Sequence, residues 1–161
     1  MSTAIPTPLG DFTARFSEHG LAEISFPTAK KRNLPEPAAR LTAPQRAWVK
    51  MTAHALKAIL TGKPPGELPP LDLSGGTEFQ QSVWRQLLQI GPGKTRSYGD
   101  IARLIKKPRA VRAVGGACGA NPIPVIIPCH RVLAANGKLG GFSGGLDRKR
   151  QLLAIEGWRT F

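Results

Sequence analysis

The chain has few residues of the kinds that form covalent or metal cross-links. Its 161 residues include two cysteines, Cys118 and Cys129, and three histidines. Two thiols are too few for a disulfide framework or a four-thiolate zinc site, and the histidines show no metal-ligand spacing. A chain of this length can bury a core without cross-links, so we expect no metal, no other cofactor and a reducing, intracellular setting.

Long apolar runs are also absent. No stretch approaches the roughly 18 consecutive apolar residues that cross a bilayer. Residues 1–12 lack the charged start and apolar core of a secretory leader. The sequence therefore predicts a soluble, unprocessed protein of the cytoplasm with no membrane partner.

Negative charge is scarce. Lys and Arg total 23 against 10 Asp and Glu, which gives a formal charge of +13 and an isoelectric point near 10.8. The excess is spread along the chain and not gathered on one amphipathic helix, which disfavours an anionic membrane. A generally basic surface would explain this charge, and an anionic polymer such as nucleic acid is the main competing explanation.

The first half of the chain has the patterns of a hairpin and one helix. Apolar and polar residues alternate over 8–27 on both sides of Glu18–Gly20, which predicts a β-hairpin with a short turn. Residues 28–42 read as a surface connection. Apolar residues at three- and four-residue steps over 44–62 predict an amphipathic helix, in which His54 is a surface or half-buried residue and not a ligand.

A segment rich in proline and glycine, residues 62–76, separates the two halves. One short strand is expected within it at 71–73, as the third strand of the first half. We therefore expect an α+β protein. A small N-terminal α/β domain with an antiparallel sheet and the connecting loop would span 1–75, and a helical C-terminal domain would span 76–161.

Two helices of the second half have clear start signals. Thr77 and Gln80 form a capping-box signature before an apolar stripe. Ser97 precedes a second short helix at 98–105. The expected apolar stripe of the first is Phe79, Val83, Leu87 and Ile90, and that of the second is Ile101, Leu104 and Ile105.

A third helix is expected to open at Pro108, which suits a first helical turn, and to run over 109–120. Together with 98–105 it would form a helix-turn-helix. The second helix of such a pair, which here carries Arg109 and Arg112, meets nucleic acid.

Two adjacent glycines interrupt this third helix. Gly115 and Gly116 each cost about 1 kcal/mol relative to alanine in a helix interior. They permit either tight packing against a neighbouring helix or close approach of the backbone to a ligand. The pattern alone leaves both explanations open.

The stretch IIPCHRV, residues 126–132, places a thiol beside an imidazole. Residues 125–127 are expected to be extended and buried, and a buried cysteine is usually inert because burial disfavours the thiolate. A neutral His130 that accepts the proton of Cys129, and is itself held by a carboxylate, would activate the thiol. Neighbouring side chains of a strand point to opposite faces, so this pairing needs a turn or an intervening water.

Glu156 is the candidate carboxylate. It ends the helix expected over 146–157, where its negative charge opposes the helix dipole by about 0.3–1 kcal/mol. A glutamate at this position needs a compensating partner. The alternative is an exposed terminal glutamate near Arg159.

Several motifs in order resemble the O6-alkylguanine-DNA alkyltransferases, the methylated-DNA–protein-cysteine methyltransferases. The resemblance covers residues 79–157, about half of the chain. The motifs are SYGDIA at 97–102, AVRAVGGACGANP at 110–122, PCHRV at 128–132, GGFSGG at 140–145 and EG at 156–157.

This resemblance implies a fold and a reaction. The first domain would be ribonuclease-H-like, and the second winged-helix-like, with DNA binding and alkyl transfer. The protein would repair DNA by one irreversible transfer of the alkyl group from O6-alkylguanine to its own cysteine, with O4-alkylthymine as an open second substrate. It would be a methyltransferase that reacts once per molecule.

The resemblance also implies catalytic roles. Cys129 would accept the alkyl group, His130 would act through a water as its base, and Glu156 would orient His130. Asn121 would be a hinge residue that ties the third helix to an active-site strand. Otherwise Asn121 merely ends that helix, where asparagine is common.

DNA contacts follow from the same resemblance. Arg112 would enter the duplex and fill the space of the extruded base. Tyr98 would rotate the phosphate on the 3′ side of the damaged nucleotide and so help to push that nucleotide out. Otherwise both are ordinary surface residues. The partner would be double-stranded DNA, bound in the minor groove largely without regard to sequence by a monomer, with cooperativity on DNA left open. Further residues expected at the DNA are Ser97, Ala113, Gly115 and Gly116.

The guanine pocket would be covered by residues 140–145. Ser143 would contact O6, and Val132 and Tyr98 would line the pocket. Phe142 stands where some relatives have tyrosine, so a hydroxyl contact from that position is missing. No cluster of cysteines and histidines lies near the N-terminus, so the zinc site of some relatives is not expected.

Three other functions compete with alkyl transfer. A DNA-binding regulator would use the same helix pair with an inert Cys129. A lesion-binding protein would flip the base and recruit other repair factors. A cysteine hydrolase is least supported, because no helix-borne cysteine signature is present and the basic surface would have no purpose.

Overall fold

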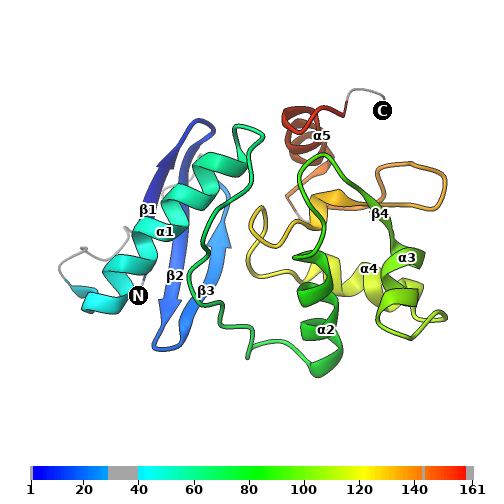
Figure 1. Ribbon diagram of the computed structural model, residues 1–161, viewed down its shortest axis with the longest axis horizontal. Coiled ribbons are helices and arrows are strands. Elements are labelled where there is room, and N and C mark those ends of the chain that lie inside the picture. Colours follow the sequence, from blue (N-terminus) through cyan, green and yellow to red (C-terminus); the bar gives the residue numbers. More distant parts are fainter. Residues whose placement is uncertain (1, 29–39, 143, 159–161) are drawn as a thin grey trace.

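The computed structural model describes residues 2–28, 40–142 and 144–158, which form a mixed α/β structure. A three-stranded sheet with helix α1 (Ala43–Ile59) lies on one side of the molecule (Figure 1). Helices α2 (Glu78–Leu87), α3 (Tyr98–Leu104) and α4 (Val111–Gly119) lie on the other side, and α5 (Leu146–Ile155) lies near the C-terminus.

The sheet is antiparallel, with β1 (Ser2–Thr7), β2 (Gly10–Ser17) and β3 (Gly20–Ser25) in that order. Strands β2 and β3 are the predicted hairpin, because Ser17 pairs with Gly20 across a two-residue turn. Alternation along β2 turns Phe12, Ala14 and Phe16 into the core.

The third strand of the sheet is β1 and not the predicted segment 71–73. Leu71 makes only an isolated parallel bridge to Leu21 of β3. Strand β1 was missed because only Ile5 of its residues is buried and because Pro6 weakens a strand pattern. Proline is tolerated there because β1 is an edge strand, where an N–H is not required on the open side.

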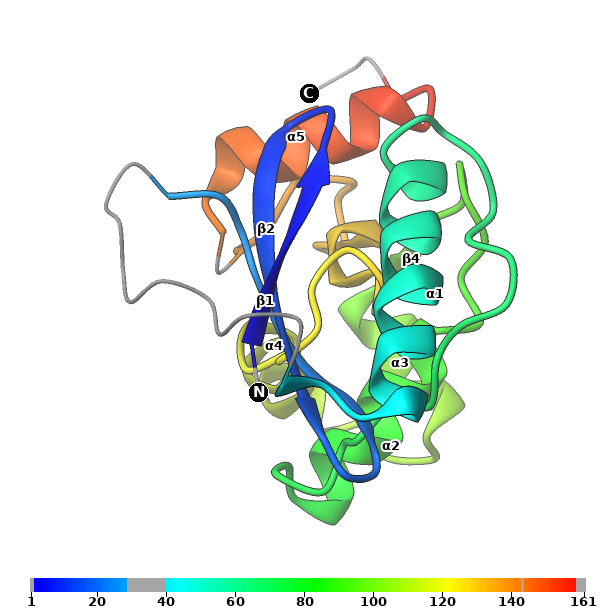
Figure 2. The same cartoon turned by 90° about the vertical axis from the view of Figure 1, so that its left-hand side faces the viewer.

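Helix α1 covers one face of the sheet (Figure 2). The Thr42 hydroxyl accepts from the Gln45 N–H and the Gln45 side chain accepts from the Thr42 N–H, which forms a complete capping box. His54 is exposed, as predicted. The side chains that α1 buries are Gln45, Thr52, Ala55, Leu56 and Ile59.

Helices α2 and α3 begin as their cap residues predict. Both capping boxes are present, at Thr77 with Gln80 and at Ser97 with Asp100. The indole N–H of Trp84 in α2 then donates to the Ala117 carbonyl of α4 at 2.8 Å, which joins the two helices.

The predicted apolar face of α3 is wrong at Leu104, which is 51% exposed. Successive helical residues are about 100° apart, so Ile101, Ala102 and Ile105 share one side and Leu104 lies outside it. Ile101 and Ala102 are fully buried. Ala102 therefore occupies the core position that the pattern assigned to Leu104.

Helix α4 begins at Val111 and not at Pro108. Lys106 adopts a left-handed conformation with φ of 62°, and the Lys107 N–H donates to the Ala102 carbonyl at 2.9 Å, which ends α3. Pro108 then lies in the connecting turn. The predicted pair of helices is present, with a longer connection than expected.

One hydrophobic cluster includes residues from both halves of the described chain, such as Phe12, Leu56, Trp84 and Ile127. The open edge of β3 adds a polar link, because the Ile24 N–H donates to the Pro122 carbonyl at 2.9 Å. The sheet thereby holds the segment that follows α4. Among the described helices, none is long and apolar enough to span a bilayer.

Gly20 is a position where glycine is required. Its φ is +149°, and a Cβ there would lie 2.2 Å from the Pro70 carbonyl oxygen. We predict that Gly20→Ala lowers the free energy of unfolding by about 2–4 kcal/mol, through backbone strain and the clash. Urea denaturation followed by circular dichroism measures the change.

Gly75→Ala is the matched control, since no atom lies within 4 Å of a Cβ at that position. It should change the free energy of unfolding by no more than about 0.5 kcal/mol. Equal values for the two variants would contradict the role given to Gly20.

Candidate active site

Cys129 lies in a turn and not at the end of a strand. Residues 125–127 are buried as predicted, but the expectation of an extended segment is wrong. Val125 has φ of 75°, and the Ile127 N–H donates to the Ile123 carbonyl at 2.9 Å, which closes a turn. Cys129 to Arg131 then form one turn of 3-10 helix (η2).

Asn121 holds this turn from its side. Its amide nitrogen donates to the Ile127 carbonyl at 2.8 Å, and its side-chain oxygen accepts from the Ile123 N–H at 2.9 Å. Asn121 is buried and lies just beyond the end of α4. The residue therefore does more than end a helix: it connects α4 to the turn that carries Cys129.

The Glu156 carboxylate lies beneath η2, with 1% of its side chain exposed. His130 Nε2 lies 3.2 Å from Oε1, and Arg131 Nε donates to both carboxylate oxygens at 3.0 Å. Burial would raise the pKa of Glu156, but the hydrogen bonds from His130 and Arg131 outweigh it and lower the pKa to about 2.

The predicted contact between His130 and Glu156 is therefore present, and the alternative of an exposed Glu156 is wrong. Arg131 was missed as the main partner of this carboxylate. Its guanidinium also donates to the Ile90 carbonyl at 2.6 Å, three residues after the end of α2. The only signal in the sequence was the position of Arg131 next to His130, the candidate base. The sequence did not show that this arginine is buried.

His130 is fully buried. Burial lowers its pKa, so the imidazole is neutral at neutral pH. If Nε2 carries the proton that it shares with Glu156, then Nδ1 is the basic nitrogen. Within the described part of the chain, Nδ1 has no hydrogen-bond partner.

Lys149 of α5 is a second residue that sequence reasoning missed. It is fully buried, and its ammonium donates to the Val132 carbonyl at 2.7 Å and to the Gly141 carbonyl at 3.1 Å. Burial lowers the pKa of Lys149. A sequence signal existed, because Lys149 lies three and four residues before Leu152 and Leu153, which α5 buries.

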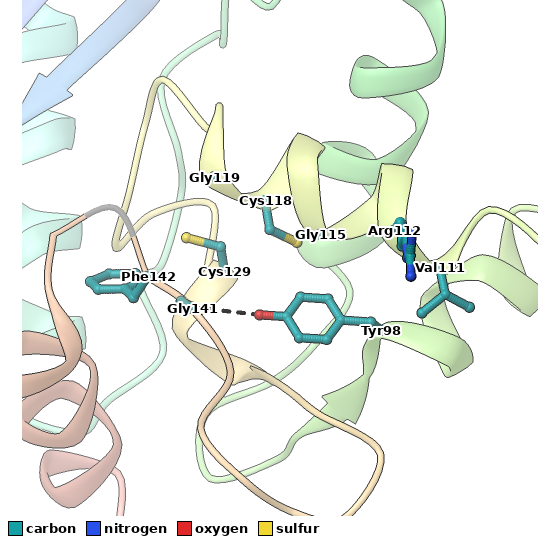
Figure 3. A pocket seen from close by; sticks show the side chains of 9 residues that line it. All are labelled: Tyr98, Val111, Arg112, Gly115, Cys118, Gly119, Cys129, Gly141 and Phe142. Atoms are coloured by element: carbon teal, nitrogen blue, oxygen red, sulfur yellow. Dashed lines mark hydrogen bonds between the residues drawn. The ribbon is translucent and has the colours of Figure 1, made fainter.

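A cavity of about 400 Å³ opens beside Cys129. This is the size range of small-molecule sites. Figure 3 shows that its lining comes from α3, α4, the Cys129 turn and the loop before α5. The lining residues are Tyr98, Val111, Arg112, Gly115, Cys118, Gly119, Cys129, Gly141 and Phe142.

The structure thus brings together four of the predicted residues with Cys129, namely Tyr98, Arg112, Gly115 and Phe142. Val132 is fully buried in strand β5 (Val132–Leu133), which pairs with β4 (Arg96–Ser97), and it is not among the residues that line the cavity. The pocket role of Val132 therefore stays a prediction. Ser143 lies outside the described residues.

Tyr98 lies across the cavity from the Cys129 turn (Figure 3), and its hydroxyl donates to the Gly141 carbonyl at 3.4 Å. Burial raises the pKa of Tyr98 to about 12, so the hydroxyl keeps its proton. Gly140 has φ of 67°, and a Cβ there would lie 2.9 Å from the Tyr98 ring. Glycine at 140 therefore permits the loop to pass close to Tyr98.

The thiol of Cys129 is almost completely buried. Burial raises its pKa, whereas the Asn121 side chain and the positive charge of Lys149 lower it. Within the described ranges, no group of three or more His, Cys, Asp or Glu side chains could hold a metal ion.

The outer surface of α4 is made of small residues and a basic side chain. Arg112, Ala113 and Gly116 are exposed. Apart from the adjacent residues and the backbone of α4 itself, no described atom lies within 4 Å of a Cβ placed at Gly115 or Gly116. Tight packing against a neighbouring helix therefore does not explain these glycines, which favours the other prediction, close approach by a ligand.

Ser97, which was predicted to lie at the DNA, caps helix α3 in this structure. Its hydroxyl accepts a hydrogen bond from the Asp100 N–H at 3.0 Å. Exposed basic residues continue from α4 into the connecting turn before it. They are Lys106, Lys107 and Arg109.

Comparisons with known proteins agree on one family. A family model described as "6-O-methylguanine DNA methyltransferase, DNA binding domain" matches residues 78–158. The methylated-DNA–protein-cysteine methyltransferase of Methanosarcina acetivorans is 42% identical over 156 residues, which cover 94% of each chain. The enzyme of that name from Mycobacterium tuberculosis is 56% identical over 94 residues, which cover 56% of this chain and 57% of the relative.

Solved structures are similar as well. The crystal structure of Mycobacterium tuberculosis OGT in complex with DNA has a TM-score of 0.79 and 40% sequence identity, and the match covers 96% of this chain and 91% of that chain. The O6-methylguanine-DNA methyltransferase of Pyrococcus kodakaraensis has a TM-score of 0.68 and 25% identity, and the match covers 98% of this chain and all of the other.

Glu156→Gln tests the buried carboxylate. We predict a loss of about 3–5 kcal/mol in the free energy of unfolding at neutral pH, because the Arg131 guanidinium stays buried without a counter-charge. The folded pKa of about 2 lies below the ordinary 4.5, so this stabilisation is complete above pH 4.5 and is lost as pH falls toward 2. The difference from wild type should therefore shrink over that range in urea titrations at several pH values.

Glu67→Gln provides the control, since Glu67 is an exposed loop residue. Its stability should follow that of the wild type at every pH. A Glu156→Gln variant that also follows the wild type between pH 7 and pH 3 would refute the role of the carboxylate.

Proposed function

The chain belongs to the 6-O-methylguanine DNA methyltransferase family, and we propose that Cys129 is the residue that takes the alkyl group from O6-alkylguanine in DNA. The protein is a DNA-repair methyltransferase that transfers the alkyl group to a cysteine of its own chain. The observation that supports Cys129 is its position: the thiol lines the cavity, and the neighbouring imidazole rests on a buried carboxylate.

Duplex DNA would lie against the outer face of α4. The small side chains of Ala113, Gly115 and Gly116 leave room for a sugar-phosphate backbone, which fits binding in the minor groove. The net charge of +13 attracts phosphates without regard to sequence and releases counterions. Lys106, Lys107 and Arg109 continue the basic surface on one side of α4.

The damaged base would then leave the duplex and enter the cavity. A poorly paired guanine lowers the few kcal/mol that extrusion requires. Arg112 is exposed on α4 at the cavity wall, where its side chain can occupy the space the base leaves. Tyr98 and Phe142 contribute aromatic side chains to the wall of the cavity, which suits a flat purine ring.

The thiol proton would pass to His130 Nδ1 through a water molecule. The Glu156 carboxylate holds the Nε2 proton, which fixes the tautomer with the Nδ1 lone pair free and stabilises the imidazolium that forms. The positive charge of Lys149 favours the resulting thiolate. These two effects oppose the burial that otherwise makes Cys129 unreactive.

The thiolate would attack the alkyl carbon in line, and the carbon–oxygen bond to guanine would break. Guanine must gain a proton as it leaves, and the protonated Tyr98 hydroxyl in the same cavity can supply it. The product is guanine and S-alkylcysteine. A thioether sulfur is a poor leaving group, so each molecule reacts once.

The finer features of the fold are part of the proposal. We propose a ribonuclease-H-like domain at 1–75 and a winged-helix-like domain at 76–161, because the sheet with α1 precedes the α3–α4 pair in the chain. The protein would act as a monomer in the cytoplasm. Several monomers would bind side by side along DNA if binding is cooperative. Ser97 would support the DNA-binding surface by capping α3.

The central experiment is mass analysis of tryptic peptide 113–131 after the protein is mixed with an equimolar duplex that carries one O6-methylguanine. We predict one added methyl group on Cys129 and a stoichiometry that does not exceed one. Cys129→Ser should lose the reaction while it keeps its affinity for DNA. An unmodified Cys129 in folded wild type would favour a DNA-binding regulator or a lesion-binding protein.

Arg112→Ala separates base extrusion from chemistry. We predict that this variant reacts about 10- to 100-fold more slowly with the duplex lesion, since the few kcal/mol that keep a base out of the stack are no longer supplied. Its reaction with free O6-alkylguanine base should change little. Single-turnover kinetics with both substrates measures the two rates.

Lys50→Ala serves as the charge-matched control, because Lys50 is exposed on α1, on the other side of the molecule from α4 (Figure 1). It should retain the wild-type rate on both substrates. If Arg112→Ala lost equal rate on the duplex and on the free base, the role of Arg112 in filling the space left by the extruded base would be rejected.

A further inference from the structure

The second cysteine of the chain lines the same cavity as the first. Cys118 lies on α4 and Cys129 on η2, and both are side chains of the cavity wall (Figure 3). They are 6% and 3% exposed. The proposed transfer reaction uses Cys129 alone and assigns nothing to Cys118.

The ionisation of Cys118 depends on its burial and on two neighbouring groups, Cys129 and Lys149. Burial, and to a smaller extent the negative charge of an ionised Cys129, raise the pKa of Cys118 to about 12. The positive charge of Lys149 lowers the pKa of both thiols. One buried cation therefore acts on two nucleophiles that line one cavity.

This arrangement matters for a lesion with two electrophilic carbons. A simple alkyl group on Cys129 is an inert end product, but a 2-haloethyl group keeps a leaving group beside the new sulfur. Such a group reacts further with the nearest nucleophile. Inside the cavity the candidates are water, a guanine of the bound DNA and the Cys118 thiol.

We propose that Cys118 is a second acceptor, which closes a thioether bridge to Cys129 after repair of an O6-(2-haloethyl)guanine lesion. The proposal rests on the proposed function of Cys129. Its consequence is that the reactive group is consumed within the protein and does not attach the protein to DNA.

The chemistry balances in three steps. Cys129 takes the 2-chloroethyl group, its thiol proton passes to His130, and guanine leaves with a proton from Tyr98. The Cys129 sulfur then displaces chloride from the second carbon and forms a three-membered episulfonium ring. The Cys118 sulfur attacks a ring carbon, one carbon–sulfur bond opens, and the Cys118 proton passes to water. The products are two cysteines joined by an ethylene group, chloride and a proton.

Two physical effects favour Cys118 over water. Both sulfurs belong to one folded chain, so the reaction has the high effective concentration of an intramolecular step. The positive charge of the episulfonium ring also favours the Cys118 thiolate, because an opposite charge nearby stabilises the charged form. The second effect arises only after the first transfer, so Cys118 is a poor competitor for the original lesion.

The test uses the full chain and an equimolar duplex with one O6-(2-chloroethyl)guanine. Trypsin releases residues 113–131 as one peptide that contains both cysteines, the only two in the chain. We expect the main alkylated product to be this peptide with an internal ethylene bridge and no thiol that iodoacetamide can label. A peptide with hydroxyethyl on Cys129 and one free thiol would overturn the proposal, as would a DNA–protein cross-link as the main product.

Cys118→Ser provides the second arm, because serine is similar in size and a much weaker nucleophile. Only alkylated molecules are compared, so a change in the transfer rate does not affect the result. The bridge should vanish, and hydroxyethylated or DNA-linked protein should rise several-fold. Equal product distributions in the two proteins would contradict the role of Cys118.

A parallel reaction with O6-methylguanine duplex separates the two proposals. Failure of wild type to modify Cys129 on either duplex would reject the proposed function itself. Normal methylation together with an unbridged chloroethyl product would reject the second acceptor alone.

Discussion

The buried carboxylate of Glu156 is the constraint on which the rest of the site depends. It lies at the end of α5, receives the Arg131 guanidinium and His130 Nε2, and through Arg131 reaches the Ile90 carbonyl, three residues after the end of α2. One ion pair thus fixes three segments that are distant in sequence. Because Cys129 begins the same 3-10 turn, the position of the thiol follows from this pairing.

The turn before Cys129 is held from the opposite side by Asn121 and by the sheet. Asn121 bonds both ends of the segment 123–127, and Pro122 accepts a hydrogen bond from the edge of β3. The N-terminal sheet therefore supports the reactive turn, although it contributes no residue to the cavity wall. Fixed polar contacts on both sides hold a buried thiol at the cavity wall with little freedom to rearrange.

Prediction from sequence succeeded where the signal was local. Capping residues located the starts of α2 and α3, and alternation located the hairpin of β2 and β3. It failed where a distant partner decides the outcome. Strand β1 has one buried residue and forms only because β2 offers its edge, and Lys149 is buried because two backbone carbonyls satisfy it.

By itself the sequence determined the basic charge, the helix starts, the order of the motifs and the identity of Cys129, His130, Asn121 and Glu156 as candidates. Only the tertiary structure decided which of them meet, that Arg131 and Lys149 join them, that Val132 does not line the cavity and that Cys118 does. The physical reason is that caps and periodicity arise within a few residues. Burial, ion pairs and cavity walls arise between segments that only the folded chain brings together.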